Sequence, residues 1–593
     1  GNMLTYAKDG VSGSITYDEL NRKTSETVNY GSFSKTYSYT YDALSNKATF
    51  TSPEGKVYAY TYNKNNQPTG IAFDGKTLAL SYQWDRLTKA TLPNGVTTDY
   101  QYNANSWLNY INTKNATSSY LDKNYEFDKV GNISRITDNA SRITDYSYDP
   151  TYQLTKAVYP PEAGKSTLTE EFAFDKVGNR LTSSSLRAEG EAISTYTHNA
   201  NNEMSQSCIV NPASCIMYAY DQNGNTIQET NGSNVTKFIY NSSDRLEKVE
   251  LPDGRIAIYS YDPYGRRIKK DVAANATYYL YADEGLIGEY DSSGNLKKAY
   301  GWMPDSMWGT DPVFMLENNN YYFYHNDHLG TPQKMTDVNG NVVWSATYIA
   351  FGEAIVDPSS TVTNNLRLPG QYYDAETGKH YNWQRYFDPG RGQYMQVDPI
   401  GFEADDVNLY RYAFNDAINL DDPTGEVIPA VIAVGYGIYK VGMFLWDLYD
   451  TYKTVTDPCA DGSVIAQEAG FVVVGAISPV GKRGTKWMVK GLRKLKKGMQ
   501  NPKVRKLLEK GKKAHRDFAE KVKQKGWKSE PSVIDPATGK TVKPDAVTTS
   551  GRPVELKPKT ESGRKAGEKQ LEKYERATGK KGKVVYYDPE EID

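Results

Sequence analysis

Cysteine is scarce in this sequence of 593 residues, which contains only Cys208, Cys215 and Cys459. So few cysteines exclude a scaffold built on disulfides and a cysteine-rich zinc module. Cys208 and Cys215 are close enough in the sequence to pair, and two unpaired buried thiols are an equal alternative. Leu, Ile and Val are sparse, yet aromatic residues make up 12% and tyrosine alone accounts for 49 residues. So many aromatics exclude a wholly disordered chain, and the length predicts at least two domains.

The chain also has almost no net charge, −2, but this balance combines two opposite parts. Residues 427–593 contain 34 Lys and Arg against 20 Asp and Glu, whereas residues 1–426 contain 36 against 52. Tyrosine divides in the same way, with 42 residues in the first part and seven in the second. The composition therefore predicts an acidic, tyrosine-rich part and a basic part that suits a polyanion. A solvated lysine-rich surface explains the basic part equally well.

A short phrase recurs along the acidic part: an aromatic residue, then Asp or Asn, then a turn. Successive phrases begin 20 to 26 residues apart, and the hexapeptide FDKVGN occurs at both 127–132 and 174–179. The residues before each phrase alternate in polarity, and such alternation punctuated by Asn and Gly predicts β-hairpins. A fixed period of this size predicts a repeat architecture in which each unit buries its face on its neighbours.

These phrases resemble the YD repeats of the Rhs family, which are shared with the C components of Tc toxins. The resemblance covers residues 1–426 and becomes more specific toward the end of that range. The segments that carry it there are YFYHNDHLGTP at 322–332, GQYYDAETG at 370–378, RYFDPGRGQY at 385–394, DPIGF at 398–402, NLYRY at 408–412 and DPTG at 422–425. The resemblance implies a mainly β fold, in which the repeats wind as a β-sheet spiral into a hollow shell around a toxic C-terminal domain.

On this basis we expect four parts. A YD-repeat β shell covers residues 1–315, and the C-terminal region of the Rhs core covers residues 316–426. A helical, partly apolar linker follows over residues 427–500, and a small α/β domain over residues 501–593. The chain begins without a signal peptide, and we expect it to be part of a longer protein.

Two Asp-Pro-x-Gly phrases, which begin at Asp398 and Asp422, suggest a first activity. In the family that the chain resembles, Asp residues at these places cut their own backbone just after the second phrase. Here this implies cleavage between Glu426 and Val427. Two neighbouring carboxylates suit general acid–base work because like charges push their pKa values apart. Glu426 stands where the family usually has Leu, and Asp421 is an extra acid. The alternative is that both phrases are only turns.

Two further features of the sequence remain ambiguous. Val427–Trp446 is mostly apolar and almost long enough to span a bilayer. Packing inside or against the shell is the favoured alternative, because small residues and Lys440 dilute this stretch, and membrane contact stays open. His325 and His328 suggest a metal site, but without further Cys or His nearby in the sequence a structural role is favoured.

The C-terminal part carries a second catalytic pattern, in which Asp545, Glu555 and Lys557 follow a Pro-Asp-x9-Glu-x-Lys spacing. A strand has a period of two, so Glu555 and Lys557 are expected on one face of a hairpin. Asp545 and Glu555 would hold Mg²⁺ or Mn²⁺, because hard cations prefer carboxylate oxygens. Lys557 would orient the attacking water or stabilise negative charge on the phosphate.

This pattern resembles the PD-(D/E)xK nuclease superfamily over residues 505–590, which implies a restriction-endonuclease-like domain. Gln570 and Tyr574 lie one helical turn apart and resemble the QxxxY helix of several of its branches. Glu520, on a basic helix before the acids, is a further candidate ligand, and Glu530 competes for that role. The alternative is that these acids are ordinary turn and edge-strand residues paired with lysine.

Together the two resemblances predict an antibacterial Rhs effector whose shell encloses a metal-dependent nuclease until self-cleavage frees it. DNA is the expected substrate, with RNA as the alternative. A cognate immunity protein, a secretion-machine spike or adaptor and a chaperone are the expected partners. The effector is expected to be made in a bacterial cytoplasm, delivered, and active in the cytoplasm of a target cell. The alternatives are a Tc-toxin-like C component acting on eukaryotic cells, and a non-catalytic YD-repeat adhesion protein with a basic nucleic-acid-binding tail.

Overall fold

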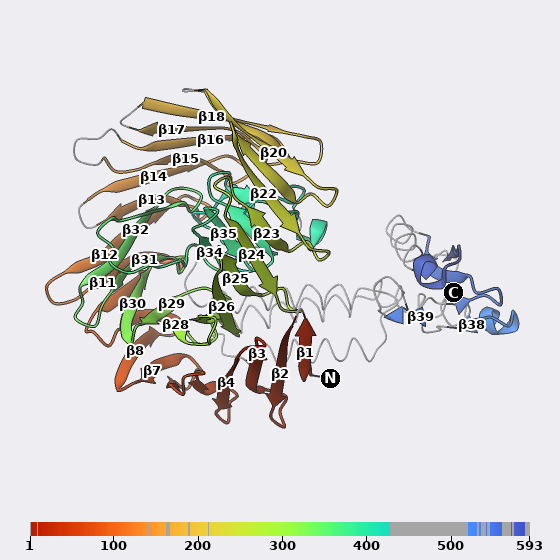
Figure 1. Ribbon diagram of the computed structural model, residues 1–593, viewed down its shortest axis with the longest axis horizontal. Coiled ribbons are helices and arrows are strands. Elements are labelled where there is room, and N and C mark those ends of the chain that lie inside the picture. The colour runs from red at the N-terminus through yellow and green to blue at the C-terminus, as the bar shows by residue number, and fades with distance from the viewer. Residues whose placement is uncertain are drawn as a thin grey trace. The chain divides into compact units, whose positions relative to one another are not determined.

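The computed structural model divides the chain into two compact units, Gly1–Gly442 and Met443–Asp593 (Figure 1). The helical linker expected at 427–500 lies outside the described residues. The structure describes residues 2–8, 10–138, 141–161, 167–187, 190–210, 213–404, 406–426, 520–529, 533–534, 541–542, 546–559, 571 and 574–587.

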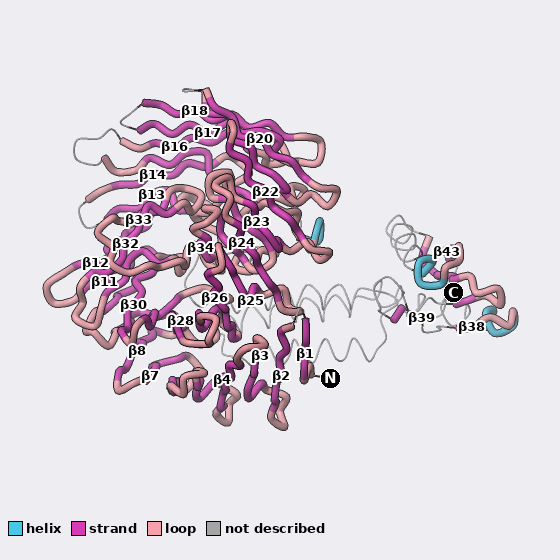
Figure 2. Tube along the Cα trace, in the orientation of Figure 1, coloured by secondary structure: helices cyan, strands magenta, loops and turns pink. Residues whose placement is uncertain are grey.

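The first unit is dominated by one antiparallel sheet of 33 strands, in which each strand pairs with the next one along the chain (Figure 2). This continuous meander confirms the predicted mainly β, repeat-based fold. Its strands are β1 (Thr5–Lys8), β2 (Val11–Tyr17), β3 (Lys23–Asn29), β4 (Ser34–Tyr41), β5 (Lys47–Thr51), β6 (Val57–Tyr62), β7 (Pro68–Phe73), β8 (Lys76–Gln83), β9 (Arg86–Thr91), β10 (Thr97–Tyr102), β11 (Leu108–Lys114), β12 (Ser119–Phe127), β13 (Ile133–Asp138), β14 (Ile143–Tyr148), β15 (Leu154–Val158), β16 (Thr169–Phe174), β17 (Arg180–Arg187), β18 (Gly190–His198), β19 (Met204–Ile209), β20 (Ser214–Tyr220), β21 (Thr226–Asn231), β22 (Asn234–Tyr240), β23 (Leu246–Glu250), β24 (Ile256–Tyr261), β25 (Arg267–Val272), β26 (Asn275–Ala282), β27 (Gly285–Tyr290), β28 (Leu296–Trp302), β29 (Pro312–Glu317), β30 (Asn320–Asn326), β31 (Pro332–Thr336), β32 (Val342–Tyr348) and β33 (Ala354–Val356).

Each repeat phrase forms a turn that the side chain of its Asp or Asn holds together. At Asp221, the carboxylate Oδ1 accepts the backbone N–H groups of Asn223 and Asn225, both at 2.9 Å. The Asp221 N–H donates in turn to the Asn225 carbonyl at 3.0 Å. A short acceptor side chain is what this turn requires, which explains why Asp or Asn recurs. The same side-chain pattern occurs at Asp42, Asn63, Asn103, Asp128, Asp149, Asp175, Asn241, Asp262, Asp291 and Asp337.

Where a tyrosine precedes the turn, its hydroxyl joins the repeat to the one before it. The Tyr261 hydroxyl donates to the carbonyl of Leu246, the first residue of β23, at 2.6 Å. The strand pairing shifts register at this tyrosine, so a bulge aims the side chain. The ring is buried while the hydroxyl satisfies a backbone acceptor, a combination that phenylalanine lacks. Equivalent bonds join Tyr62 to Lys47, Tyr102 to Leu87, Tyr148 to Ile133, Tyr220 to Met204, Tyr240 to Thr226 and Tyr281 to Arg267.

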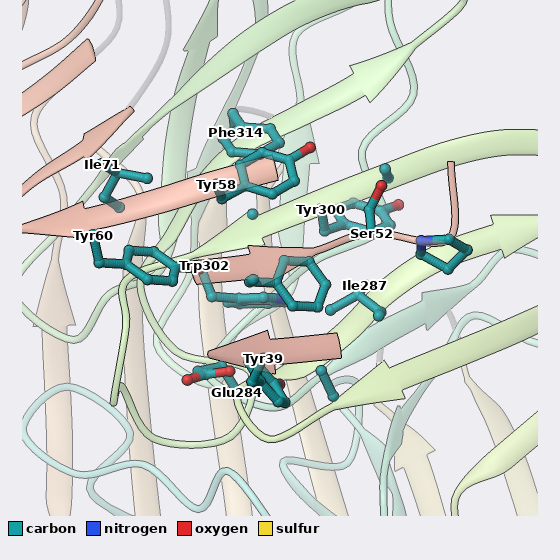
Figure 3. Close-up of a pocket in the computed structure, with 15 residues that line it drawn as sticks. Tyr39, Ser52, Tyr58, Tyr60, Ile71, Glu284, Ile287, Tyr300, Trp302 and Phe314 are labelled. Atoms are coloured by element: carbon teal, nitrogen blue, oxygen red, sulfur yellow. The ribbon is translucent and has the colours of Figure 1, made fainter. Parts of the chain in front are cut away.

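The sheet curls so that strands far apart in the sequence meet along a seam. The Tyr30 hydroxyl donates to the Tyr279 carbonyl at 2.7 Å, and the rings of Tyr58 and Phe314 stack with centroids 5.5 Å apart. A cavity of only about 30 Å³ remains in the seam, and Figure 3 shows Tyr58, Phe314 and Glu284 among the side chains around it. The core here is therefore rich in aromatic rings, and tyrosine supplies many of them.

Residues 366–426, which we call the core-terminal segment, follow the sheet and contain little regular structure. Arg267 of β25 anchors the segment: its buried guanidinium pairs with both carboxylate oxygens of Asp374, one of them at 3.0 Å. Lys270 donates to the same carboxylate at 2.8 Å. The elements of the segment are β34 (Tyr372–Asp374), β35 (Lys379–Asn382), β36 (Arg385–Asp388), β37 (Gln393–Tyr394) and the 3₁₀ helices η1 (Gly401–Ala404) and η2 (Ala413–Asn415).

The core-terminal segment is hydrogen-bonded to the turns of successive repeats. It crosses them from the turn at 262–266 back to Ile133, the first residue of β13. The bonds run between Trp383 and Tyr264 (3.1 Å), Gln384 and Arg245 (2.7 Å), Tyr410 and Gly224 (2.8 Å), Val407 and Asn202 (3.4 Å), Asn408 and Asn179 (2.8 Å), Asn415 and Gln153 (2.9 Å), and Asn419 and Ile133 (2.8 Å).

The second unit contains short strands and a small aliphatic core. The core consists of Val522, Ala546 and Val554, with Trp527 and Val585 packed against it. Helical residues are found at 520–524 and 574–578. The strands are β38 (Lys528–Ser529), β39 (Val533–Ile534), β40 (Thr541–Val542), β41 (Ala546–Val547), β42 (Pro553–Pro558) and β43 (Lys583–Tyr587). β42 pairs antiparallel with β41 and parallel with β43, so this unit mixes both kinds of pairing.

The hairpin of β19 and β20 decides the state of two cysteines. Cys208 and Cys215 lie directly opposite one another in its register and form a disulfide, with their Cα atoms 4.0 Å apart. Neither residue is buried. The alternative of two unpaired buried thiols is therefore wrong, because the register of the hairpin, rather than the spacing in sequence, brings the two side chains together.

Candidate functional site

Both Asp-Pro-x-Gly phrases form tight turns, and each Asp side chain accepts backbone N–H groups. Asp398 Oδ1 accepts the Ile400 N–H at 3.0 Å. Asp422 Oδ1 accepts the N–H groups of Gly425 at 2.8 Å and Glu426 at 3.2 Å. The turn interpretation of these phrases is thus compatible with the geometry. It leaves the second carboxylate oxygen, Oδ2, of each Asp available for another partner.

The side chain of Arg385 brings the two Asp residues together. Its Nη2 lies 2.9 Å from Asp398 Oδ2 and 3.1 Å from Asp422 Oδ2. Its Nε donates to the Gly425 carbonyl at 2.6 Å, so the same guanidinium also holds the end of the second turn. All three charged side chains are buried. The two candidate self-cleavage residues therefore share one cation at the point where the chain leaves the core-terminal segment.

Tyr394 of β37 supports this arrangement from one side. Its hydroxyl donates to Asp422 Oδ2 at 2.8 Å, and the Arg385 guanidinium lies 3.6 Å from the centre of its ring. Asn382 donates to the Asp422 carbonyl at 2.7 Å and to the Tyr394 hydroxyl at 2.9 Å. Hydrogen bonds and a cation–π contact thus fix the Asp422 carboxylate in one orientation.

The electrostatics of the Asp398 carboxyl suit a proton donor. Burial raises the pKa of Asp398, the Arg385 guanidinium opposes this, and the Asp422 and Glu426 carboxylates add to the rise, so that the pKa lies at about 6. Burial also raises the pKa of the half-buried Glu426. A carboxyl with this pKa is partly protonated near neutral pH, which general acid catalysis requires. Val427, on the other side of the expected scissile bond, lies outside the described residues.

Sequence reasoning gave no role to Arg385 and treated Asp421 only as an irregularity. Arg385 is the first residue of the RYFDP motif, and its charge within that motif is the feature of the sequence that could have indicated a role at the site. Asp421 is buried, and neither of its carboxylate oxygens has a hydrogen-bond partner. Burial and the adjacent Asp422 hold the pKa of Asp421 well above its usual range.

The C-terminal candidates are described only in part. Residues 555 and 557 are alternate positions of β42, paired in register with Val584 and Tyr586 of β43. Lys557 is buried, with 6% of its surface exposed, and Tyr574 is buried in the helical stretch at 574–578. Glu520 is exposed at the start of the described helix. Asp545, Gln570 and the competing Glu530 lie outside the described residues, so the roles predicted for the C-terminal residues stay predictions.

The histidine pair predicted to be structural is enclosed by the fold. His325 Nε2 hydrogen-bonds the Thr336 hydroxyl at 2.9 Å, and His328 Nε2 the Ile418 carbonyl at 2.8 Å. Burial lowers the pKa of both imidazoles, that of His325 to about 3. Within the described part of the chain, no three His, Cys, Asp or Glu residues gather as a metal site. No helix in that part combines the length and apolar character needed to cross a bilayer, and Val427–Trp446 lies outside it.

Two family models match the sequence. The model described as Teneurin YD-shell matches residues 5–155 and 132–418, which is more than half of the chain. The model described as Restriction endonuclease fold toxin 9 matches residues 504–585.

Several known proteins are similar to this chain. The Double-stranded DNA deaminase toxin A of Burkholderia cenocepacia (strain H111) is 29% identical over 356 residues, or 54% of this chain and 23% of that protein. The tRNA3(Ser)-specific nuclease WapA of Bacillus spizizenii is 28% identical over 438 residues, or 72% of this chain and 16% of that protein. A structure of the Photorhabdus luminescens Tc holotoxin pore with a TccC3 variant shares the fold over 73% of this chain and 24% of its own, with a TM-score of 0.61 and 18% identity.

The chain spans less than a quarter of the length of each of these proteins. The first match covers the strand meander with its phrase-specific turns and buried tyrosines. The second match falls on the basic part of the chain, beyond the core-terminal segment. The chain therefore belongs to the YD-shell family, and it has the organisation of a YD-repeat polymorphic toxin with a restriction-endonuclease-fold toxin segment at its C-terminal end.

Proposed function

We propose that this chain is a YD-repeat toxin whose C-terminal domain hydrolyses phosphodiester bonds in nucleic acid. The match of residues 504–585 to a restriction-endonuclease-fold toxin carries the proposal. The two relatives above are named for different activities, one a deaminase and one a nuclease, although both resemble more than half of this chain. Likeness in the shell therefore carries no information about the toxic activity, which has to be inferred from the C-terminal segment.

The chemistry proposed for this domain rests on the acids and the lysine of the sequence pattern. Carboxylates at positions 545 and 555 form a hard oxygen donor set that fits Mg²⁺ or Mn²⁺. When bound, such an ion polarises a phosphate and lowers the pKa of a coordinated water. Lys557, two positions from Glu555 on β42, stabilises the negative charge that develops on the phosphate. Gln570 and Tyr574 are proposed to orient the substrate, and Glu520 to assist metal binding.

The test uses the full chain with plasmid DNA and total RNA, with Mg²⁺ or with EDTA. We expect metal-dependent degradation, and Glu555→Ala or Lys557→Met to abolish it. Lys581→Met is the matched control, because Lys581 is exposed and has the same charge. Degradation that persists in both variants would rule out this mechanism. The relative rates on the two substrates decide between DNA, which we propose, and RNA.

Self-cleavage between Glu426 and Val427 is a second proposed activity, supported by the buried contact of Arg385 with Asp398 and Asp422. In the proposed reaction a water adds to the Glu426 carbonyl carbon and gives a proton to the Asp422 carboxylate. Asp398 donates its proton to the Val427 nitrogen as the C–N bond breaks. The products are a new carboxyl group and a new amine, and a proton returns from Asp422 to Asp398 through solvent.

A denaturing gel and mass spectrometry test this reaction. We expect two fragments, the smaller one beginning at Val427, and a single intact band for Asp398→Ala and for Asp422→Ala. Asp337→Ala is the control, since Asp337 accepts two backbone N–H groups in a similar turn at 2.8 and 2.9 Å. An uncut wild-type chain contradicts self-cleavage, and cleavage in both active-site variants contradicts the assigned residues.

The proposed setting is antibacterial delivery into the cytoplasm of a target cell. A cognate immunity protein would bind the freed domain, and a secretion spike or adaptor and a chaperone would act through regions outside this chain. The likeness to the Tc holotoxin structure shows the fold alone, so it does not favour the Tc-like alternative. The non-catalytic adhesion alternative predicts neither degradation nor cleavage in the two experiments above.

A further inference from the structure

The loop that carries Asp398 is held by a shell turn far away in the sequence. In the core-terminal segment, residues 394–398 and 409–411 run alongside one another: the Tyr394 N–H donates to the Tyr410 carbonyl at 2.8 Å, and the Asp398 N–H to the Leu409 carbonyl at 3.0 Å. These two stretches fix the backbone on which Asp398 sits. The repeat turn between β20 and β21, at residues 221–226, contacts both stretches.

Two residues of this turn contact the Asp398 loop directly. Thr226 is fully buried, and both its backbone N–H and its hydroxyl donate to the Met395 carbonyl at 2.9 Å. The Gly224 carbonyl accepts the Tyr410 hydroxyl at 2.8 Å. The Asp398 loop is therefore bonded to this turn through both of its stretches.

Gly224 also leaves no room between the turn and the loop. A Cβ atom there would lie 2.5 Å from the Tyr410 hydroxyl and 2.5 Å from Cγ2 of Val397, the residue before Asp398. Heavy atoms do not approach this closely, so any larger residue would displace the loop or the turn. Gly254 ends a similar repeat turn with φ of 84°, against 80° for Gly224, but a Cβ at Gly254 meets nothing within 4 Å.

We propose that the 221–226 turn is a positioning element for self-cleavage, so that the Asp398–Asp422 pair is assembled only when the hairpin of β20 and β21 has folded and docked. This inference rests on the proposed self-cleavage. Arg385, Asp398 and Asp422 all belong to the core-terminal segment, yet the Asp398 loop is also bonded to the repeats. Folding of this part of the shell thus precedes cutting, and a chain whose repeats have not wound correctly keeps its C-terminal domain attached.

The matched glycine pair gives the sharpest test. Full chains with Gly224→Ala or Gly254→Ala are made by cell-free synthesis, and the growth of the Val427 fragment is followed with time. Both variants carry the same strain of an L-residue at positive φ. We expect cleavage to slow by about tenfold or more in Gly224→Ala and to match the wild type in Gly254→Ala. Equal rates in the two variants would overturn the proposal.

A threonine series tests the same element without a clash. Thr226→Val removes the hydroxyl donor, and we expect cleavage about fivefold slower, in line with the loss of one buried hydrogen bond. Thr226→Ser keeps the hydroxyl donor but loses the methyl group, so we expect it to cleave at the wild-type rate. If packing of the methyl group were what mattered, the serine variant would cleave slowly. Thr113→Val is the control, because Thr113 is equally buried but bonds Thr98 within the repeats.

The outcomes separate this inference from the proposed function. If the wild-type chain stays intact, self-cleavage itself is wrong. If the wild type cuts and Thr226→Val cuts as fast as Thr113→Val, self-cleavage stands and the positioning role of the turn is refuted. Resistance of each variant to limited proteolysis, compared with the wild type, shows whether the shell has folded and excludes a global defect as the cause.

Discussion

Two regions of the molecule are stabilised by different kinds of side chain: residues 1–426, and the described parts of residues 520–587. The first region has few aliphatic residues and builds its seam largely from tyrosine and phenylalanine rings, and the tyrosines before the repeat turns donate to carbonyls of the preceding repeat. The second has a small aliphatic core around Val522 and Val554 under a lysine-rich surface. The first region is acidic and the second basic. Tyrosine thus marks the shell assembled from repeats, and lysine marks a part of the chain whose charge suits a polyanion.

The largest expected effect is on the anchoring of the core-terminal segment to the shell. Asp374→Ala leaves the fully buried Arg267 without its carboxylate partner, and an uncompensated buried charge costs about 3–5 kcal/mol. We expect the urea midpoint followed by tryptophan fluorescence to fall accordingly. Asp253→Ala removes an exposed partner of Arg255 and is the control, with a change near zero. Equal midpoints for the two variants would mean that this buried pair does not anchor the segment.

A second effect concerns the contrast in charge between the regions. Lys521, Lys523, Lys525 and Lys528 are exposed, and if each contacts a phosphate, raising salt from about 50 to 200 mM weakens binding by about a hundredfold. Anisotropy of a labelled oligonucleotide with the Glu555→Ala chain in EDTA measures this affinity. Replacing Lys523 and Lys525 by Gln should flatten the salt dependence. The same change at the exposed shell residues Lys129 and Lys176 should leave the salt dependence unaltered. If the salt dependence flattens in this shell variant instead, the shell is the part that binds the oligonucleotide.

The pH dependence of self-cleavage tests the role proposed for Asp398 as the proton donor. Because the pKa of Asp398 is raised to about 6, its protonated form falls about tenfold for each pH unit above 6, and the cleavage rate should fall with it. Glu426→Gln removes a charge that raises this pKa, so the decline should begin at lower pH. A rate that rises between pH 6 and 8 would contradict Asp398 as the acid. Because the pKa is raised by folding, the folded state holds the Asp398 proton more tightly than the unfolded state does. The resulting contribution to the free energy of unfolding is complete below about pH 4 and is lost as the pH rises through 6.

The smallest effect concerns the tyrosines that link the repeats. Tyr102→Phe removes a hydroxyl that donates to the Leu87 carbonyl at 2.9 Å, and we expect a loss of about 1 kcal/mol in unfolding free energy. The buried Tyr39 hydroxyl has no hydrogen-bond partner, so Tyr39→Phe should be neutral or slightly stabilising. The two variants remove the same atom, and equal effects would show that ring packing alone, without the hydroxyl bond, accounts for the tyrosine excess.

Much of this architecture could be predicted because its determinants are local. An Asp or Asn after the aromatic residue accepts N–H groups two and four positions later, so a hexapeptide such as that at 127–132 specifies its own turn. The Asp398 and Asp422 candidates were also recognisable, since both lie in short motifs. The disulfide was not, because Cys208 and Cys215 are paired by the register of a hairpin whose turn the sequence did not locate.

The long-range contacts were beyond sequence reasoning for a physical reason. Arg385 joins Asp398 to Asp422, and Thr226 holds the carbonyl of Met395, but no periodicity or spacing connects these residues. Such pairs depend on how the sheet curls, and small changes of twist accumulate over many strands before the seam closes.

The sequence by itself determined that this protein is a repeat of tyrosine-linked hairpins followed by a basic, acid-bearing domain, because turns, strand alternation and charge are properties of neighbouring residues. Only the tertiary structure decided which repeat supports which part of the core-terminal segment. It also raised the pKa of Asp398 to about 6, because burial and the approach of other charges exist only after the chain has folded.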